Sequence, residues 1–189
     1  MNNNSDAVSE SALNRGEVFR ADFSDQKIPF NVLPVTKKDD VAIIADKNIL
    51  NIKGPATLIG KEFLPVIPDN IYQMTIVLRA YETEKGSVEP VLFAGFATYD
   101  ENKTLQTAAP GTHRYFLSVG KIKTDTEQLE DGWLKISGLI TGTANDRFSF
   151  REGSRYAKPV MILNQQRPDS LTDIRLVSVV VIKGDFTLD

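Results

Sequence analysis

The chain has 189 residues, a net charge of −3 and a hydrophobic fraction of 41%, close to the average of globular proteins. This charge argues against a nucleic-acid-binding protein, which would carry a basic stripe or face. The chain has no cysteine, so disulfides, thiolate nucleophiles, zinc ribbons and iron–sulfur clusters are excluded. Its single histidine, His113, excludes any site within one chain that needs two imidazoles.

Residues 1–16 are polar, and we expect a flexible arm that precedes a β-sandwich domain of residues 17–189. Residues 1–13 have neither a basic segment nor an apolar core, so they do not read as a secretory signal peptide. The longest near-apolar run, Leu176–Ile182, is far shorter than the roughly 20 residues that span a bilayer. We therefore expect no membrane span.

From residue 17 onward, short apolar runs alternate with Pro, Gly, Asn and Asp, a pattern typical of strands and turns. No segment keeps a 3.6-residue period, so helices are expected to be minor. The expected strands, in chain order, are Val18–Phe23, Val41–Ala45, Asn48–Lys53, Glu62–Val66, Ile71–Tyr81, Val91–Tyr99, Tyr115–Val119, Trp133–Thr141, Lys158–Asn164 and Asp173–Lys183.

Two of these segments indicate the architecture. Ile71–Tyr81 has its apolar residues on one face, as in a half-buried strand: Tyr72, Met74, Ile76, Leu78 and Ala80. Val91–Tyr99 is apolar on both faces, which indicates a central strand, and Gly95 in its middle indicates a bulge or a close approach by another group. About eight to ten strands with almost no helix predict an all-β antiparallel sandwich, with a jelly roll as the first choice.

Several short motifs resemble one family of jelly rolls. Phe63–Tyr72 reads F-x-P-V-x-P-x-x-x-Y, Gly95–Asp100 reads G-x-x-x-Y-D, Trp133 leads a later strand, and Gly153–Pro159 reads G-S-x-Y-x-x-P. Together they resemble the carbohydrate-binding-module type of jelly roll, related to galactose-binding-like domains. Similar modules occur in bacteriophage tail and virion proteins and in secreted polysaccharide-active enzymes. Four aromatic residues of these segments are expected in or near the core: Phe63, Tyr72, Phe93 and Phe96.

The resemblance implies that exposed aromatic side chains stack on sugar rings, with polar neighbours that fix the hydroxyls. Tyr99 and Trp133 are the aromatic candidates for ligand binding, and Trp133 has packing in the core as its alternative. His113 and Arg114, next to each other before Tyr115–Val119, are candidate polar contacts. A surface histidine and a solvated arginine are the alternatives for this pair.

No catalytic residue is expected. Adjacent carboxylates such as Asp100–Glu101 lie in turns and lack the apolar cleft that glycoside hydrolysis needs, and no nucleophile-elbow motif is present. The resemblance allows a structural calcium ion, with Asp22, Asp25 and Asp185 as candidate ligands. No other cofactor or metal is expected.

Three hypotheses for the function follow from these features. The first is a non-catalytic bacteriophage virion protein, a capsid decoration or tail-associated protein that is assembled in the cytoplasm. It would attach to other virion or particle subunits through the arm of residues 1–16. The second is a carbohydrate-binding module for adhesion to host or substrate glycans, and the third is a small hydrolase. Exposed sheet edges further predict an oligomer.

Overall fold

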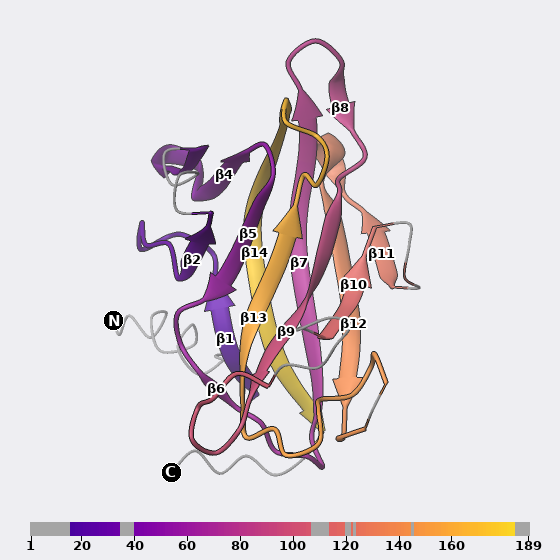
Figure 1. Cartoon of the computed structure of the whole chain (residues 1–189). Helices are drawn as coiled ribbons and strands as arrows, with labels where there is room; N and C mark the ends of the chain where they lie inside the picture. Colours follow the sequence, from indigo (N-terminus) through magenta and orange to yellow (C-terminus); the bar gives the residue numbers. More distant parts are fainter. Residues whose placement is uncertain are drawn as a thin grey trace, which may run out of the picture.

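Two antiparallel β-sheets face each other and form a sandwich (Figure 1). The structure is a computed structural model that describes residues 16–34, 40–106, 114–119, 122, 124–144 and 146–183. Within these residues, helical structure is limited to Asp40 and two short 3-10 turns, η2 (Ala45–Lys47) and η3 (Glu130–Gly132). The all-β sandwich that the sequence predicts is confirmed.

The larger sheet has eight strands: β1 (Glu17–Ala21), β3 (Val41–Ile44), β4 (Ile49–Lys53), β7 (Ile71–Glu82), β8 (Gly86–Val88), β11 (Asp125–Gln128), β12 (Leu134–Thr141) and β14 (Ser170–Lys183). Their order is β11-β12-β7-β14-β4-β3, with β1 also paired with β14 and β8 with β7. The long strands β7 and β14 pair along their whole length and form the centre of this sheet.

The smaller sheet has six strands: β2 (Phe30–Leu33), β5 (Ala56–Gly60), β6 (Leu64–Pro65), β9 (Leu92–Tyr99), β10 (Arg114–Ser118) and β13 (Tyr156–Leu163). Their order is β10-β9-β13-β5-β2, and β6 pairs with β13. Strands β2 and β10 therefore lie at its two edges. Strand β9 has neighbours on both sides, as its apolar sequence predicts.

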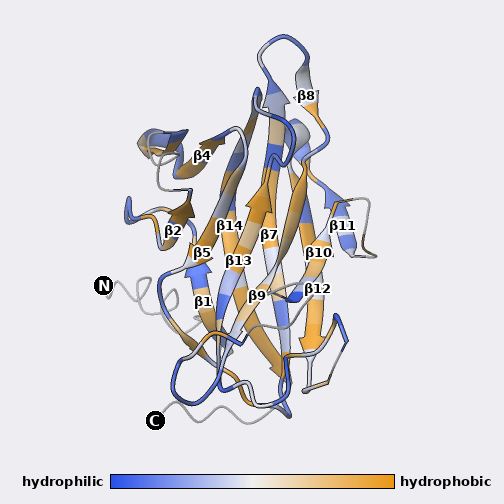
Figure 2. Cartoon of the chain, in the orientation of Figure 1, coloured by the Kyte–Doolittle hydropathy of each residue, from blue (hydrophilic) through white to orange (hydrophobic). Residues whose placement is uncertain are grey.

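The core lies between the sheets because alternate residues of each strand point to the same face. Strand β7 shows this alternation: four of its inward-facing side chains are at most 3% exposed, namely Tyr72, Met74, Ile76 and Leu78. Figure 2 shows that hydrophobic colour follows most strands of both sheets, whereas β11 and the loop between β7 and β8 are hydrophilic.

Of the four aromatic residues expected in or near the core, Tyr72 and Phe96 lie in the core. Phe63 and Phe93 are half-buried. Tyr72 also fixes the chain that leads into β7. Its hydroxyl accepts a hydrogen bond from the N–H of Ile67 (2.9 Å) and donates one to the carbonyl oxygen of Pro65 (3.3 Å). The Phe63–Tyr72 motif therefore has a structural role at this position.

Four observed strands are missing from the sequence-based prediction: β2, β5, β8 and β11. The expected number of eight to ten strands was therefore too low. Strand β11 has the sequence DTEQ and is exposed along its whole length, so no hydrophobic pattern marks it. Strands β2 and β5 are short, and Pro34 and Gly54 next to them suggest loops.

The predicted arm of residues 1–16 lies outside the described residues, apart from Gly16. The carbonyl oxygen of Gly16 accepts a hydrogen bond of 2.7 Å from the N–H of Val181 in β14. The division into an arm and a domain stays a prediction. In the described part of the chain, no helix has the length and apolar character needed to cross a membrane.

Candidate functional site

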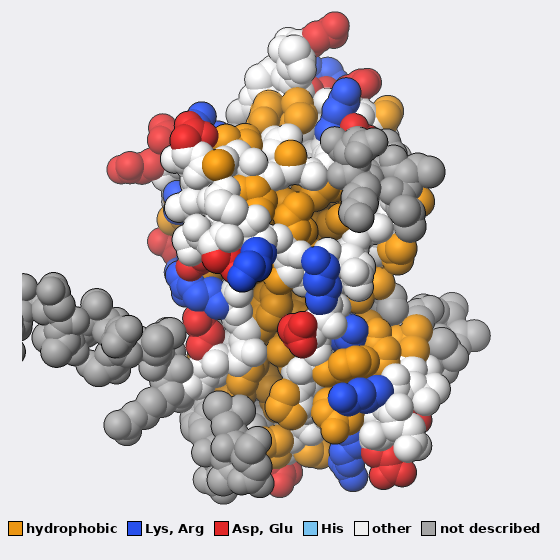
Figure 3. All heavy atoms as spheres, turned by 90° about the vertical axis from the view of Figure 1, so that its left-hand side faces the viewer, with side chains coloured by type: hydrophobic (Ala, Val, Ile, Leu, Met, Phe, Trp, Pro, Cys, Tyr) orange, Lys and Arg blue, Asp and Glu red, His pale blue; other side chains and the backbone are white. Residues whose placement is uncertain are grey.

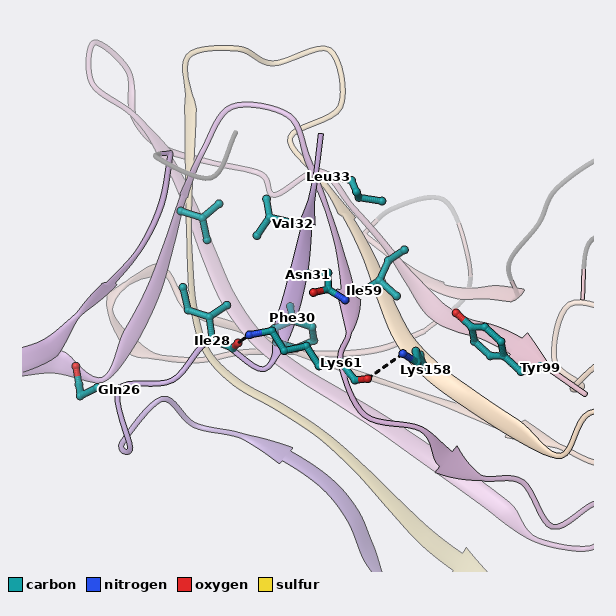
Figure 4. A pocket seen from close by; sticks show the side chains of 11 residues that line it. Gln26, Ile28, Phe30, Asn31, Val32, Leu33, Ile59, Lys61, Tyr99 and Lys158 are labelled. Carbon is teal, nitrogen blue, oxygen red and sulfur yellow. Dashed lines mark hydrogen bonds between the residues drawn. The ribbon is translucent and has the colours of Figure 1, made fainter. Parts of the chain in front are cut away.

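An open hollow of about 890 Å³ surrounds the edge strand β2 (Figure 4). It is lined by Gln26, Ile28, Phe30, Asn31, Val32, Leu33, Val41, Ile59, Lys61, Tyr99 and Lys158. Within the described residues, β2 pairs with β5 alone and so lies at the edge of the six-stranded sheet. The surface that faces the viewer in Figure 3 includes the side of β2, and hydrophobic side chains gather on it with Lys and Arg side chains among them.

The part of this hollow on the outer face of the six-stranded sheet is here named the β2 groove, and it is formed by Asn31, Leu33, Ile59, Tyr99 and Lys158. The alternation of β2 decides which side chains enter it. Phe30 is 2% exposed and points into the core, whereas Leu33 is 43% exposed. Asn31 lies opposite Ile59 in the β2–β5 register, which places an amide beside an apolar side chain.

Three aromatic side chains, here named the aromatic cluster, adjoin the β2 groove at Tyr99: Phe63, Tyr99 and Tyr156. Tyr99 and Tyr156 lie opposite each other on β9 and β13. Phe63 makes edge-on contacts with both, at centroid distances of 4.9 Å to Tyr99 and 5.8 Å to Tyr156. Burial raises the pKa of Tyr99, so its hydroxyl stays protonated at neutral pH and can donate a hydrogen bond. Figure 4 shows this hydroxyl turned toward the groove.

Lysine side chains surround the aromatic cluster. The Nζ atom of Lys158 donates to the carbonyl oxygen of Lys61 (2.8 Å), and the Nζ atom of Lys61 donates to that of Ile28 (2.8 Å), as Figure 4 shows. Lys158 Nζ also lies 4.0 Å from the centroid of the Phe63 ring, and Lys103 Nζ lies 5.1 Å from it. This end of the site is therefore both aromatic and cationic.

Trp133 lies beside the other, eight-stranded sheet. Its side chain is 6% exposed and packs against Ile49 and Val77. The guanidinium carbons of Arg79 and Arg175 lie 4.7 Å and 4.8 Å from the centre of the indole. The ring is buried and already in contact with two cations, as the packing alternative for Trp133 expects, and a role as a stacking platform gains no support from this position.

Arg114 does not line the β2 groove. It begins β10, and its Nη2 atom donates to the carbonyl oxygen of Ala144 (3.2 Å). Burial and the nearby Arg151 lower the pKa of Arg114, and Asp146 acts in the opposite direction. Its predicted role in ligand binding gains no support from this position. His113 lies outside the described residues, so its role stays a prediction.

Two of the three candidate calcium ligands lie in the loop after β1, beside a second hollow of about 600 Å³. Asp22 pairs with Arg20 (2.9 Å) and Asp25 with Lys27 (3.6 Å), and the pKa of Asp22 falls to about 2, chiefly through the hydrogen bond from Arg20. Asp185 lies outside the described residues. Among the residues that are described, no three His, Asp or Glu side chains gather as a metal site would need. The calcium ion stays a prediction.

Sequence reasoning singled out Tyr99 but missed the other residues of the site. Asn31, Leu33 and Ile59 lie on strands that the sequence pattern did not reveal. Lys158 and Tyr156 lie in the quoted segment Gly153–Pro159, which was considered for its likeness to a fold and not for binding. That motif is therefore the sequence signal that could have pointed to Tyr156 and Lys158 as binding residues.

No protein-family model matches the sequence, and no curated protein matches it. The fold is similar to the CBM22-1 xylan-binding domain from Paenibacillus barcinonensis Xyn10C, with a TM-score of 0.53 and 12% identity over 90% of this chain and 97% of that one. The CBM22-1 and GH10 modules of Clostridium thermocellum Xyn10B have a TM-score of 0.44 and 10% identity, over 92% of this chain and 30% of that one. The enzymatically active domain of bacteriophage CBA120 tailspike protein 4 has a TM-score of 0.40 and 9% identity, over 71% of this chain and 15% of that one. The similarity to the xylan-binding domain shows that the chain has a carbohydrate-binding-module-like β-sandwich fold.

Proposed function

We propose that this protein is a non-catalytic carbohydrate-binding module and that the β2 groove, with the adjoining aromatic cluster, is the binding surface. The observation that carries the proposal is the composition of the groove. Leu33 and Ile59 provide apolar surface, while the amide of Asn31 and the hydroxyl of Tyr99 provide hydrogen-bonding groups in the same hollow. The similarity of the fold to a xylan-binding domain supports this choice.

The chemistry of a sugar fits such a surface. A pyranose ring has apolar C–H faces that pack on aliphatic or aromatic side chains, and its equatorial hydroxyls need donors and acceptors at the rim. Asn31 can supply both a donor and an acceptor, and the protonated hydroxyl of Tyr99 can do the same. An open groove along an edge strand also leaves room for a chain of sugar units to continue beyond the site.

The lining of the hollow favours binding over catalysis. Glycoside hydrolysis uses two carboxyl groups about 5 to 10 Å apart on either side of the scissile bond. Among the described residues that line the hollow, none is Asp or Glu. We therefore propose no hydrolytic role for this groove.

The test is binding to a panel of soluble and insoluble plant, bacterial and capsular polysaccharides, measured by affinity electrophoresis and isothermal titration calorimetry. We expect binding to at least one polysaccharide, and a loss of about tenfold or more in affinity for Tyr99→Ala, because the change removes both an aromatic contact and a hydrogen-bonding hydroxyl, and a tenfold change corresponds to about 1.4 kcal/mol. Leu139→Ala is the matched control, since Leu139 is 45% exposed on the other sheet. Absence of binding across the panel, or equal affinities of Tyr99→Ala and the control, would refute the proposal.

Attachment to a virion or particle surface remains a further proposal for the arm. It is tested by deleting residues 1–15 and measuring incorporation into particles, with the fold checked by circular dichroism. Normal incorporation of the shortened chain would remove the idea.

A further inference from the structure

We infer that the β2 groove binds an acidic glycan, with the carboxylate or sulfate group of one sugar unit held between Lys158 and Lys103 beside Phe63. This inference rests on the proposed function and narrows it from carbohydrates in general to negatively charged ones. It follows from the positions of the lysines around the aromatic cluster.

Two ammonium groups lie over one aromatic ring. Lys158 Nζ is 4.0 Å from the centroid of Phe63 and 5.9 Å from that of Tyr99. Lys103 Nζ is 5.1 Å from the centroid of Phe63 and 5.2 Å from that of Tyr156. Each cation is attracted to the electron-rich faces of the rings, so both are held at the aromatic cluster, and Lys158 also lines the β2 groove.

Within the part of the chain that the structure describes, no ion pair joins Lys61, Lys103 or Lys158 to a carboxylate. Lys135 on the eight-stranded sheet, by contrast, pairs with Glu127 at 3.0 Å. Lys61 and Lys158 line the hollow, and Lys103 lies beside it over the rings of Phe63 and Tyr156. Their charges raise the positive potential of this region and attract an anion.

The acidic residues nearest to Lys103 in sequence close their own turn or are exposed. Asp100 uses its Oδ1 atom to accept the N–H groups of Asn102 (2.9 Å) and Thr104 (2.8 Å), which closes its own turn. Glu62 lines the second hollow of about 600 Å³ together with Lys61, whereas Lys103 and Lys158 do not line it. Glu101 is exposed in the turn after Asp100. The positive charges of Lys103 and Lys158, which lie beside the aromatic cluster, are therefore left for a ligand.

The same geometry disfavours a neutral sugar at this position. A sugar ring can stack on Phe63 only if it first displaces the ammonium groups of Lys158 and Lys103 from the phenyl ring. Each displacement loses one cation–π contact. An acidic group can instead approach the ammonium groups themselves. Lys158 donates one hydrogen bond to the carbonyl oxygen of Lys61, and an ammonium group has three donors, so two remain for an anion.

The experiment compares acidic and neutral forms of the same polymers. The probes are polygalacturonic acid against its methyl-esterified form, and dextran sulfate against dextran, each titrated at low salt and again at about 0.5 M salt. We expect at least about tenfold tighter binding of one acidic form than of its neutral counterpart, and weakening at high salt because screening shortens the range of the attraction. Preference for the carboxylate pair or for the sulfate pair identifies which group the site takes.

Single variants locate the effect. Lys158→Met and Lys103→Met keep the length and apolar stem of the side chain and remove the charge, and each is expected to weaken binding of the acidic polymer by about fivefold or more. Lys53→Met is the matched control, because Lys53 is exposed on the eight-stranded sheet, and its affinity should stay within about twofold of the parent protein.

Each outcome decides a different claim. Equal or tighter binding of the neutral forms, or the same loss in Lys53→Met as in Lys158→Met, overturns the acidic-glycan inference and leaves the proposed function standing. Absence of binding to these polymers and to every polysaccharide of the wider panel overturns both. Binding that prefers the acidic form and depends on Lys158 and Lys103 supports both.

Discussion

Gly95→Ala should break the junction between β9 and β10. A methyl group at Gly95 would lie 2.7 Å from the carbonyl carbon of Arg114 and 2.9 Å from the Cα of Tyr115, and closer still to the carbonyl oxygen of Arg114. All three atoms belong to the backbone, so no rotation of a side chain relieves the clash. The register shifts between Tyr115 and Leu117 at this same point. The close approach that the sequence offers as one reading of Gly95 is thus confirmed, and the register shift lies opposite Gly95 on β10.

The magnitude follows from what β10 buries. Overpacking that the structure can absorb costs about 1 to 3 kcal/mol. Here β10 must move away from β9, and it carries Phe116 and Leu117, which are 1% and 0% exposed. Partial exposure of these two side chains, each worth about 1.5 to 3 kcal/mol when fully buried, brings the expected loss of unfolding free energy to about 3 to 5 kcal/mol.

The assay is urea unfolding at 25 °C, followed by the fluorescence of Trp133, the one tryptophan of the chain. Gly86→Ala is the matched control: Gly86 has a φ of +74° with nothing within 4 Å of an added Cβ, so it tests backbone conformation without a clash. Its expected cost is about 1 kcal/mol. A loss below about 1 kcal/mol for Gly95→Ala, with the amides of β10 still protected from hydrogen exchange, would refute the reasoning.

Three further predictions concern the parts of the structure away from the β2 groove. Trp133→Ala should lower the unfolding free energy by about 3 to 4 kcal/mol, measured by circular dichroism, and leave glycan affinity unchanged, since Trp133 is buried on the other sheet. Asp173→Ala removes the 2% exposed carboxylate that pairs with Arg79 at 3.0 Å; a loss of about 2 to 3 kcal/mol is expected, and a loss below 1 kcal/mol would contradict the importance of this pair. The pKa of Asp22 is lowered to about 2 from 3.8, so the folded state gains stability from ionised Asp22 above about pH 4 and loses it as the pH falls toward 2. Comparison of the parent with Asp22→Asn should show a difference of about 0.5 to 1 kcal/mol at pH 6, reduced by solvent screening, that disappears near pH 2.

Long strands of the core could be predicted from local sequence. In β7 the inward residues alternate with polar ones, and in β14 a run of β-branched residues leaves little choice of structure. The two strands pair along their full length, so the hydrophobic pattern of β7 faces the same side of the sheet as that of β14. This local agreement is why the fold class followed from the sequence.

The binding surface was much harder to predict, because it depends on pairing between distant segments. Asn31 and Ile59 become neighbours when β2 pairs with β5, and neither strand has a pattern strong enough to identify it. Phe63 and Tyr99 are 4.9 Å apart although 36 residues separate them in the chain. Of the predicted ligand contacts, Tyr99 lies in the groove, whereas Trp133 lies beside the opposite sheet.

Trp133 shows the physical reason most clearly. A tryptophan after a turn and before a strand can either cover the sheet or face solvent, and its own neighbours in sequence do not distinguish the two. Arg79 on β7 and Arg175 on β14 determine the outcome, because the guanidinium group of each lies over the indole and covers it. The sequence by itself determined an all-β chain with apolar strand faces, because hydrophobic alternation is a local property. The tertiary structure decided which polar and aromatic side chains share a surface, because that depends on which strands become neighbours.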